Sequence, residues 1–230
     1  MRLDRLVSKF LELGSRNARE RLASRAVTVN GVTESDGSRL IGCIDRVELG
    51  NTVLQSRTPH YIALHKPSGY VSATTDPEHP TVIDLIDAPW ADELHLAGRL
   101  DRFTTGLVIL TNDSHFSEAL TLPEQKVPKT YFVDTDVTIS IGAVAAIRSG
   151  IRLEKENVTT APASIELFSE RSCRLTIYEG KHHQVKRMFA KFDTKVTRLH
   201  RESVGSVALE SLKPGQWREL TTREMDRWRP

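Results

Sequence analysis

The chain has 230 residues, with 32 lysines and arginines against 30 aspartates and glutamates, and its formal net charge is +2. Hydrophobic residues make up 39% of it, which is the composition of an ordinary globular protein and excludes a disordered or fibrous chain. The longest apolar run, residues 141–147, is too short to cross a bilayer, and the first residues lack the apolar core of a signal peptide. Two cysteines, Cys43 and Cys173, fit neither a disulfide framework nor a thiolate metal site, so we expect a cytoplasmic protein without a membrane partner.

Positive charge is concentrated in two segments of this nearly neutral chain. Residues 15–25 hold four arginines against one glutamate, and residues 181–201 hold seven lysines and arginines against Asp193 alone. Local basic patches of this kind favour a polyanion bound at defined places.

The first 58 residues predict a small unit of two helices and short strands. Residues 3–13 have apolar positions at helical spacing and Gly14 ends that helix, while Ser15 can cap a second helix from Arg16 to Arg25. Residues 27–32 alternate around an Asn-Gly turn, and residues 46–49 form another short strand. A polar connector over residues 55–59 follows, so we place the domain boundary near residue 58 and a second domain at 59–230.

The second domain alternates strands with a few helices. Strands are predicted at 61–64, 107–110, 129–135, 163–168 and 173–178, and helices at 138–150, from Glu179-Gly180 onward, and after Thr221 or Thr222. Residues 82–86 fit either a short helix or a strand. Strands joined by hairpins, with helices inserted, indicate an α+β domain with a mixed, mainly antiparallel sheet.

Residues 98–106 form the candidate catalytic loop. Asp101 lies between Arg99 and Arg102, with a glycine at each end of the segment, and the apolar run 107–110 fixes the loop at the edge of a core. Neighbouring cations favour an ionised carboxylate, which can act as a nucleophile, a base or an electrostatic clamp. Taken alone, however, an aspartate in a glycine-bounded loop is more typical of a turn or a surface ion pair.

Other catalytic patterns are absent from the sequence. His182 and His183 are adjacent and would point about 100° apart on a helix, so they do not suit one shared ion, and we expect no metal site. The chain has no glycine-rich phosphate loop ending in Gly-Lys-Ser/Thr and no Gly-x-Ser-x-Gly nucleophile elbow.

Several motifs, in this order, carry a family resemblance. Residues 2–4, 15–25 and 27–31 resemble an S4 domain, a small RNA-binding module. The segments 98–107, 129–131 and 179–188 together resemble the pseudouridine synthases that modify ribosomal RNA and carry an N-terminal S4 domain. Residues 181–187 and 199–202 are most similar to the small-subunit, RsuA-type branch, because relatives acting on the large subunit tend to carry Arg-Asn-Arg before the shared glutamine.

This resemblance implies a function. The chain would isomerise a uridine of 16S ribosomal RNA, uridine 516 by family analogy, to pseudouridine. The reaction breaks the N1–C1′ bond and rejoins the base through C5 without redox change, so no metal or organic cofactor is expected. The implied partner is 16S ribosomal RNA or the assembling small subunit, and we expect a monomer. Alternatives are a synthase acting on 23S ribosomal RNA, a non-catalytic S4-type ribosome-assembly factor, and a nucleoside or glycoside hydrolase using Asp101.

The resemblance also implies roles for individual residues. Asp101 would attack the sugar C1′ or the base C6, and Tyr131 would stack on the base and take part in removing the C5 proton. Lys186 would pair with Asp101, although many synthases have arginine here and the adjacent Arg187 is a rival partner. Arg99 would fill the space that the flipped base leaves. Contact with RNA is implied for Arg99, Arg102, Thr105, Arg16, Arg19, Arg25 and Arg187.

Overall fold

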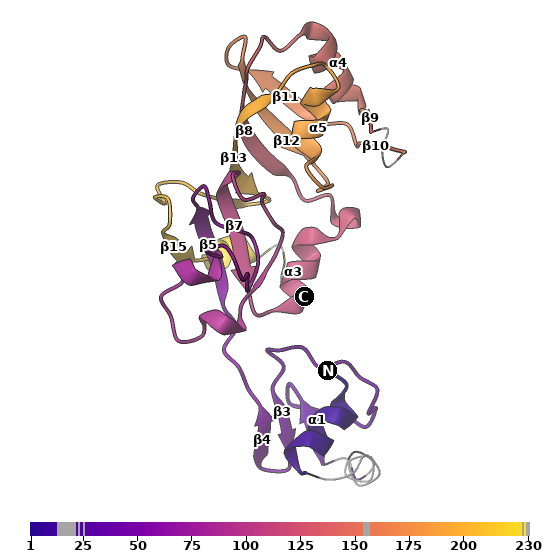
Figure 1. Cartoon of the computed structure of the whole chain (residues 1–230). Helices are drawn as coiled ribbons and strands as arrows, with labels where there is room; N and C mark the ends of the chain where they lie inside the picture. The colour runs from indigo at the N-terminus through magenta and orange to yellow at the C-terminus, as the bar shows by residue number, and fades with distance from the viewer. Residues whose placement is uncertain (13–21, 23, 25, 154–156, 227, 229–230) are drawn as a thin grey trace. The chain divides into compact units, whose positions relative to one another are not determined.

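The computed structural model describes residues 1–12, 22, 24, 26–153, 157–226 and 228, and the chain divides into two compact units (Figure 1). Unit 1 comprises Met1–His60 with Asn112–His115, and unit 2 comprises Tyr61–Thr111 with Phe116–Pro230. The predicted second helix, with Arg16, Arg19 and Arg25, lies outside the described residues. Within the described part, no helix has both the length and the apolar character needed to cross a membrane.

Unit 1 contains helix α1 (Leu3–Phe10) and a four-stranded sheet in the order β2-β1-β3-β4. The strands are β1 (Val27–Val29), β2 (Val32–Thr33), β3 (Val47–Leu49) and β4 (Thr52–Gln55). Asn30 and Gly31 both have positive φ, 53° and 78°, as the two-residue turn of a tight hairpin requires. Leu3 and Val7 are buried on one face of α1, so the predicted helix is present, although it ends at Phe10 rather than at residue 13.

Unit 2 is built on a nine-stranded sheet. Its main order is β11-β12-β8-β13-β7-β5-β15, with β14 on β13 and β6 on β7, and every pairing is antiparallel except that of β13 with β7. The strands are β5 (Tyr61–Lys66), β6 (His95–Leu96), β7 (Thr105–Thr111), β8 (Lys129–Thr135), β11 (Ser164–Leu167), β12 (Ser172–Ile177), β13 (Val196–Val204), β14 (Val207–Ala208) and β15 (Trp217–Glu219). A separate pair joins β9 (Arg152–Leu153) to β10 (Val158–Thr159). The α+β class with a mainly antiparallel sheet is therefore confirmed.

Short helices cover this sheet. They are α3 (Ser114–Thr121), α4 (Ile141–Ser149), α5 (Gln184–Ala190), α6 (Thr222–Met225) and the 3₁₀ turns η1 (Ile83–Leu85), η2 (Ala91–Glu93) and η3 (Pro123–Gln125). Figure 1 shows α4 and α5 beside β11, β12 and β8 at one end of unit 2. Thr221, one of the two predicted caps, caps α6 through a capping box.

One predicted helix begins later than expected, and one helix was not predicted. The predicted helix from Glu179-Gly180 begins only at Gln184, because His183 adopts a left-handed conformation with φ 50° that interrupts helical geometry. Helix α3 was not predicted. Its buried apolar side chains are Phe116 and Leu120, and two positions four residues apart are too few to show a helical period.

Strand β7 lies at the centre of unit 2 and is buried on both faces. Val108 and Leu110 pack into the cluster that includes α4 and α5, whereas Leu107 and Ile109 pack on the opposite side with Phe116 of α3. The candidate catalytic loop, residues 98–106, therefore leads directly into an enclosed strand of the sheet, and its position is fixed by that core.

Candidate active site

The loop before β7 is closed by a tight turn. The Thr104 amide donates to the Asp101 carbonyl at 3.0 Å, so Arg102 and Phe103 occupy the corner of the turn. Gly106 follows with φ 113°, and a Cβ at this position would lie 2.3 Å from the Arg201 carbonyl oxygen of β13. Only glycine permits this close approach of β7 to β13.

A buried lysine that the sequence analysis did not single out holds this turn from below. Lys66, at the end of β5, is fully buried, and its Nζ donates to the carbonyls of Arg102 at 2.9 Å, Thr104 at 2.8 Å and Pro67 at 3.1 Å. Burial lowers the pKa of Lys66 to about 8, Asp101 opposes the lowering, and Arg201 adds to it. A cation with three carbonyl partners fixes the backbone on both sides of Phe103.

A second buried cation, also missed, supports the loop from β13. Arg201 is 2% exposed, and its Nε donates to the Leu107 carbonyl at 2.7 Å, while Nη1 reaches the Arg99 carbonyl at 3.4 Å. Its Nη2 is buried and has no hydrogen-bond partner among the described residues. Together, Lys66 and Arg201 hold the backbone from Arg99 to Leu107.

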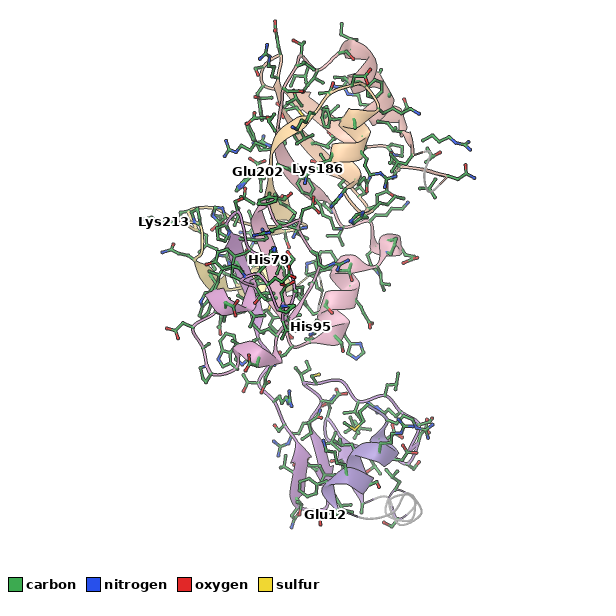
Figure 2. All side chains as sticks on the ribbon, viewed as in Figure 1. Glu12, His79, His95, Lys186, Glu202 and Lys213 are labelled. Carbon is green, nitrogen blue, oxygen red and sulfur yellow. The ribbon has the colours of Figure 1, made fainter. Side chains whose placement is uncertain are left out.

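Each oxygen of the Asp101 carboxylate has one nitrogen atom close to it. Lys186 Nζ donates to Oδ2 at 2.7 Å, and His183 Nε2 lies 3.2 Å from Oδ1 (Figure 2 labels Lys186 on α5). The guanidinium of Arg187 instead donates to the His182 carbonyl at 3.2 Å. Of the two candidates that the sequence offered, Lys186 therefore forms the hydrogen bond to Asp101.

The segment before α5 is shaped so that His183 faces this carboxylate. His183 has a left-handed backbone, and its ring stacks on that of His182 with centroids 3.8 Å apart. Gln184 anchors the segment by accepting from the Lys181 amide at 3.0 Å and donating to Glu179 at 2.7 Å. The sequence predicted both histidines on a helix, pointing about 100° apart. This prediction is wrong, because His182 and His183 both precede α5.

A pocket of about 210 Å³ opens beside Asp101. Since one water occupies about 30 Å³ of the liquid, this space is several times the volume of a single water. Tyr131 of β8 is 7% exposed and lines the pocket, and in the described part of the chain its hydroxyl makes no hydrogen bond. Asp101 is the only acidic residue in the lining, whereas glycoside hydrolysis normally uses a pair of carboxyl groups.

Other titratable groups of the site are shifted by burial. Lys129, which lines the pocket, has its pKa lowered to about 8 by burial, with Arg201 adding to the effect. Burial also lowers the pKa of His200, and His65, 5.3 Å away between ring centres, acts in the same direction. The interior beneath the loop is therefore crowded with cationic or potentially cationic groups, and Asp101 is the anion that acts on Lys66.

The remaining predicted RNA contacts lie around this pocket. Arg99 and Arg102 are exposed and line a wider cavity of about 830 Å³, which shares Asp101 and His183 with the smaller pocket. Arg102 Nε donates to the Gly69 carbonyl at 3.1 Å. Thr105 is half buried, and its hydroxyl is 2.8 Å from Nδ1 of His200, so it faces the sheet.

Comparison with known proteins identifies the family that this geometry fits. Residues 60–191 match the family model described as RNA pseudouridylate synthase. The ribosomal small subunit pseudouridine synthase A of Pseudomonas aeruginosa is 45% identical over 98% of this chain and 99% of its own, and that of Escherichia coli is 39% identical over 98% of both. A solved pseudouridylate synthase structure superposes with a TM-score of 0.74, at 37% identity and 99% coverage of both chains.

The chain therefore belongs to the RNA pseudouridylate synthase family and, within it, to the ribosomal small subunit pseudouridine synthases of the RsuA type. It is an enzyme that forms pseudouridine in ribosomal RNA. The family resemblance noted in the sequence is confirmed by these comparisons.

Proposed function

We propose that the substrate is one uridine of 16S ribosomal RNA, uridine 516 by analogy, presented in the RNA or in the assembling small subunit. The full-length similarity to synthases named for the small ribosomal subunit supports this choice over a 23S substrate. The target base leaves its stack and enters the pocket beside Asp101, at a cost of a few kcal/mol.

Asp101 is the nucleophile of this reaction. The observation that carries the assignment is the carboxylate at the pocket, held by Lys186 at 2.7 Å and His183 at 3.2 Å on its two oxygens. Each oxygen retains a lone pair for attack at the sugar C1′ or the base C6, while the hydrogen bond from Lys186 and the contact with His183 fix the direction of the carboxylate. Covalent attachment keeps the base or sugar bound during the rotation that exchanges N1 for C5.

Tyr131 and Arg99 act on the flipped nucleotide. Tyr131 presents its ring and an unengaged hydroxyl to the pocket, so it can stack on uracil and take part in proton removal from C5. Arg99 is exposed beside the pocket mouth and takes the place of the extruded base in the RNA. Arg102 and Arg187 contact phosphates nearby.

Residues 1–58 form an RNA-binding domain of the S4 type, and residues 59–230 form the catalytic domain. The helix α1 and four-stranded sheet of unit 1 support the first assignment, as does similarity to the relatives that extends over 98% of the chain. Arg16, Arg19 and Arg25 bind the RNA backbone, which positions the substrate more than it selects a sequence.

Mapping pseudouridine across ribosomal RNA, from cells with and without this protein, tests the proposal. We expect one small-subunit position to lose its modification. Loss in large-subunit RNA would support the 23S alternative, an unchanged map with retained RNA binding would support an assembly factor, and release of free uracil by the purified protein would support a hydrolase.

A further inference from the structure

Phe103 is the most exposed aromatic side chain near the nucleophile. It occupies the corner of the turn that begins at Asp101, and 70% of its surface is exposed. Isolated exposed apolar residues are common on proteins and need no function. Three features of Phe103 set it apart: the rigidity of its backbone, its cationic neighbour and its distance from the nucleophile.

The backbone around Phe103 is fixed on both sides. The Arg102 carbonyl, which precedes Phe103, accepts from the Gly69 amide at 3.0 Å and from Lys66 Nζ at 2.9 Å. The Thr104 carbonyl, which follows it, accepts from the same Nζ at 2.8 Å. The fold therefore holds a phenyl ring in water on a preorganised turn, and a ligand that binds it pays little conformational entropy.

The surroundings of the ring suit a nucleic acid. The guanidinium of Arg102 lies 5.2 Å from the ring centroid, a cation–π arrangement that leaves most of the ring surface accessible. Arg102 and, four residues before Phe103, Arg99 are both exposed and can meet phosphates. An aromatic face joined to arginines is the combination that binds single-stranded bases.

The distance to Asp101 fits a nucleotide adjacent to the target. Two residues span at most about 7 Å of chain, and successive nucleotides are about 3.4 Å apart along one strand. While Asp101 faces the extruded uridine, Phe103 is thus within reach of a base next to the gap.

We propose that Phe103 stacks on the nucleobase adjacent to the flipped uridine, and so holds the RNA open at the target. The inference rests on the proposed RNA substrate and on Asp101 as the reactive group. It adds a binding subsite outside the pocket that receives the target base.

The test uses the full chain and a 16S ribosomal RNA fragment with 2-aminopurine next to the target uridine, on the 5′ side in one RNA and on the 3′ side in another. Tritium release from C5-labelled RNA by the unmodified protein first establishes the activity, so failure there concerns the proposed function and not Phe103. Phe103→Leu, Phe103→Ala and Phe103→Trp are compared with Phe168→Leu. Phe168 is a matched control, because it is 48% exposed and its ring centroid lies 4.9 Å from the guanidinium of Arg174. It follows β11, the edge strand of the sheet, which is separated from β7 by β12, β8 and β13.

We expect Phe103→Leu and Phe103→Ala to weaken RNA binding by about 5- to 100-fold, the range for loss of one stacked base. Phe103→Trp restores binding, and its indole fluorescence is quenched by RNA beyond any change in the unmodified protein. When the unmodified protein binds, the emission of 2-aminopurine on one side of the target uridine changes, and it does not change when Phe103→Leu binds. Phe168→Leu behaves as the unmodified protein. Equal binding by Phe103→Leu, or emission changes that do not depend on Phe103 on either side, would overturn the inference.

Discussion

In the proposed mechanism, Lys186 acts through its hydrogen bond to Asp101. Lys186→Gln removes the charge, and a hydrogen bond to a charged group is worth about 1.5–3 kcal/mol. We therefore expect the single-turnover rate of tritium release to fall by about 10- to 100-fold. Arg187→Gln is the matched control, because Arg187 donates to the His182 carbonyl; a larger rate loss for Arg187→Gln would reverse the assignment of the two cations.

At the residue scale, the sequence identifies the groups that form linear motifs and misses those that act through tertiary contacts. Asp101, Tyr131 and Lys186 stand in recognisable segments, and the structure places all three at one pocket. Lys66 precedes a proline in what the sequence presents as an ordinary turn, and its burial depends on β7 packing over it. Arg201 gains its partners only from the pairing of β13 with β7.

At the scale of elements, the parallel contact between β7 and β13 depends on Gly106. Gly106→Ala would put a Cβ 2.3 Å from the Arg201 carbonyl oxygen at a φ of 113°. We expect the free energy of unfolding to fall by about 3 kcal/mol or more, since backbone strain and a backbone clash add. Gly215→Ala is the control, because Gly215 has φ 81° with open space around it and should cost about 1–2 kcal/mol. Equal losses, measured by urea unfolding, would show that the close approach does not constrain the sheet.

Lys66 at the end of β5, which donates hydrogen bonds to the loop carbonyls, predicts that the stability of the fold depends on pH. Burial lowers the pKa of Lys66 from 10.5 to about 8 in the folded chain. Between pH 8 and pH 10.5, the unfolded chain holds a proton on Lys66 that the folded chain has released. Lys66 therefore makes the free energy of unfolding rise with pH from about 8 to 10.5. This contribution is lost as the pH falls back through 8. Lys66 changes the free energy of unfolding by at most about 1.4 kcal/mol per pH unit.

Comparison with Lys66→Met isolates this effect. Lys129 has a similar shift, but it is present in both proteins and cancels in the difference. Urea unfolding at pH 7.5, 8.5 and 9.5 should give a steeper rise for the unmodified protein than for Lys66→Met. Parallel curves would mean that Lys66 is not deprotonated in this range.

The elements that could be predicted are those whose pattern is local. Strands β5, β7 and β8 and helix α4 follow from apolar runs and clear end signals. The start of α5 could not be predicted, because the left-handed His183 is maintained by contacts with Asp101 and His182 that no local pattern encodes. The parallel β7–β13 pairing joins strands about 90 residues apart and was equally inaccessible.

At the scale of the whole molecule, the charge of the N-terminal unit should set the salt dependence of RNA binding. Replacing Arg16, Arg19 and Arg25 together by glutamine removes three cations that we propose contact phosphates. Each lost contact lowers the slope of log K against log salt by about 0.7–0.9, so we expect a decrease of about 2–3. Arg46→Gln in the same unit is the control, because Arg46 pairs with Glu48 at 2.6 Å; an unchanged slope for the triple variant would exclude the proposed role.

The family was accessible from sequence because the segments 98–107, 129–131 and 179–188 occur in a recognisable order. The α+β class follows from the strands joined by hairpins with helices inserted. The structure confirms the class, and the comparisons confirm the family. The order of the motifs could not predict that two buried cations, Lys66 and Arg201, hold the backbone of the loop that carries Asp101.

The most direct test of the central claim is Asp101→Asn, which removes the carboxylate that we propose as the nucleophile and keeps the size of the side chain. With small-subunit RNA labelled with tritium at uridine C5, we predict that tritium release falls to the background rate while RNA affinity stays within about threefold of the unmodified protein. Asp92→Asn, on the exposed turn η2, should retain full activity. Tritium release by Asp101→Asn at a rate near that of the unmodified protein would contradict the account.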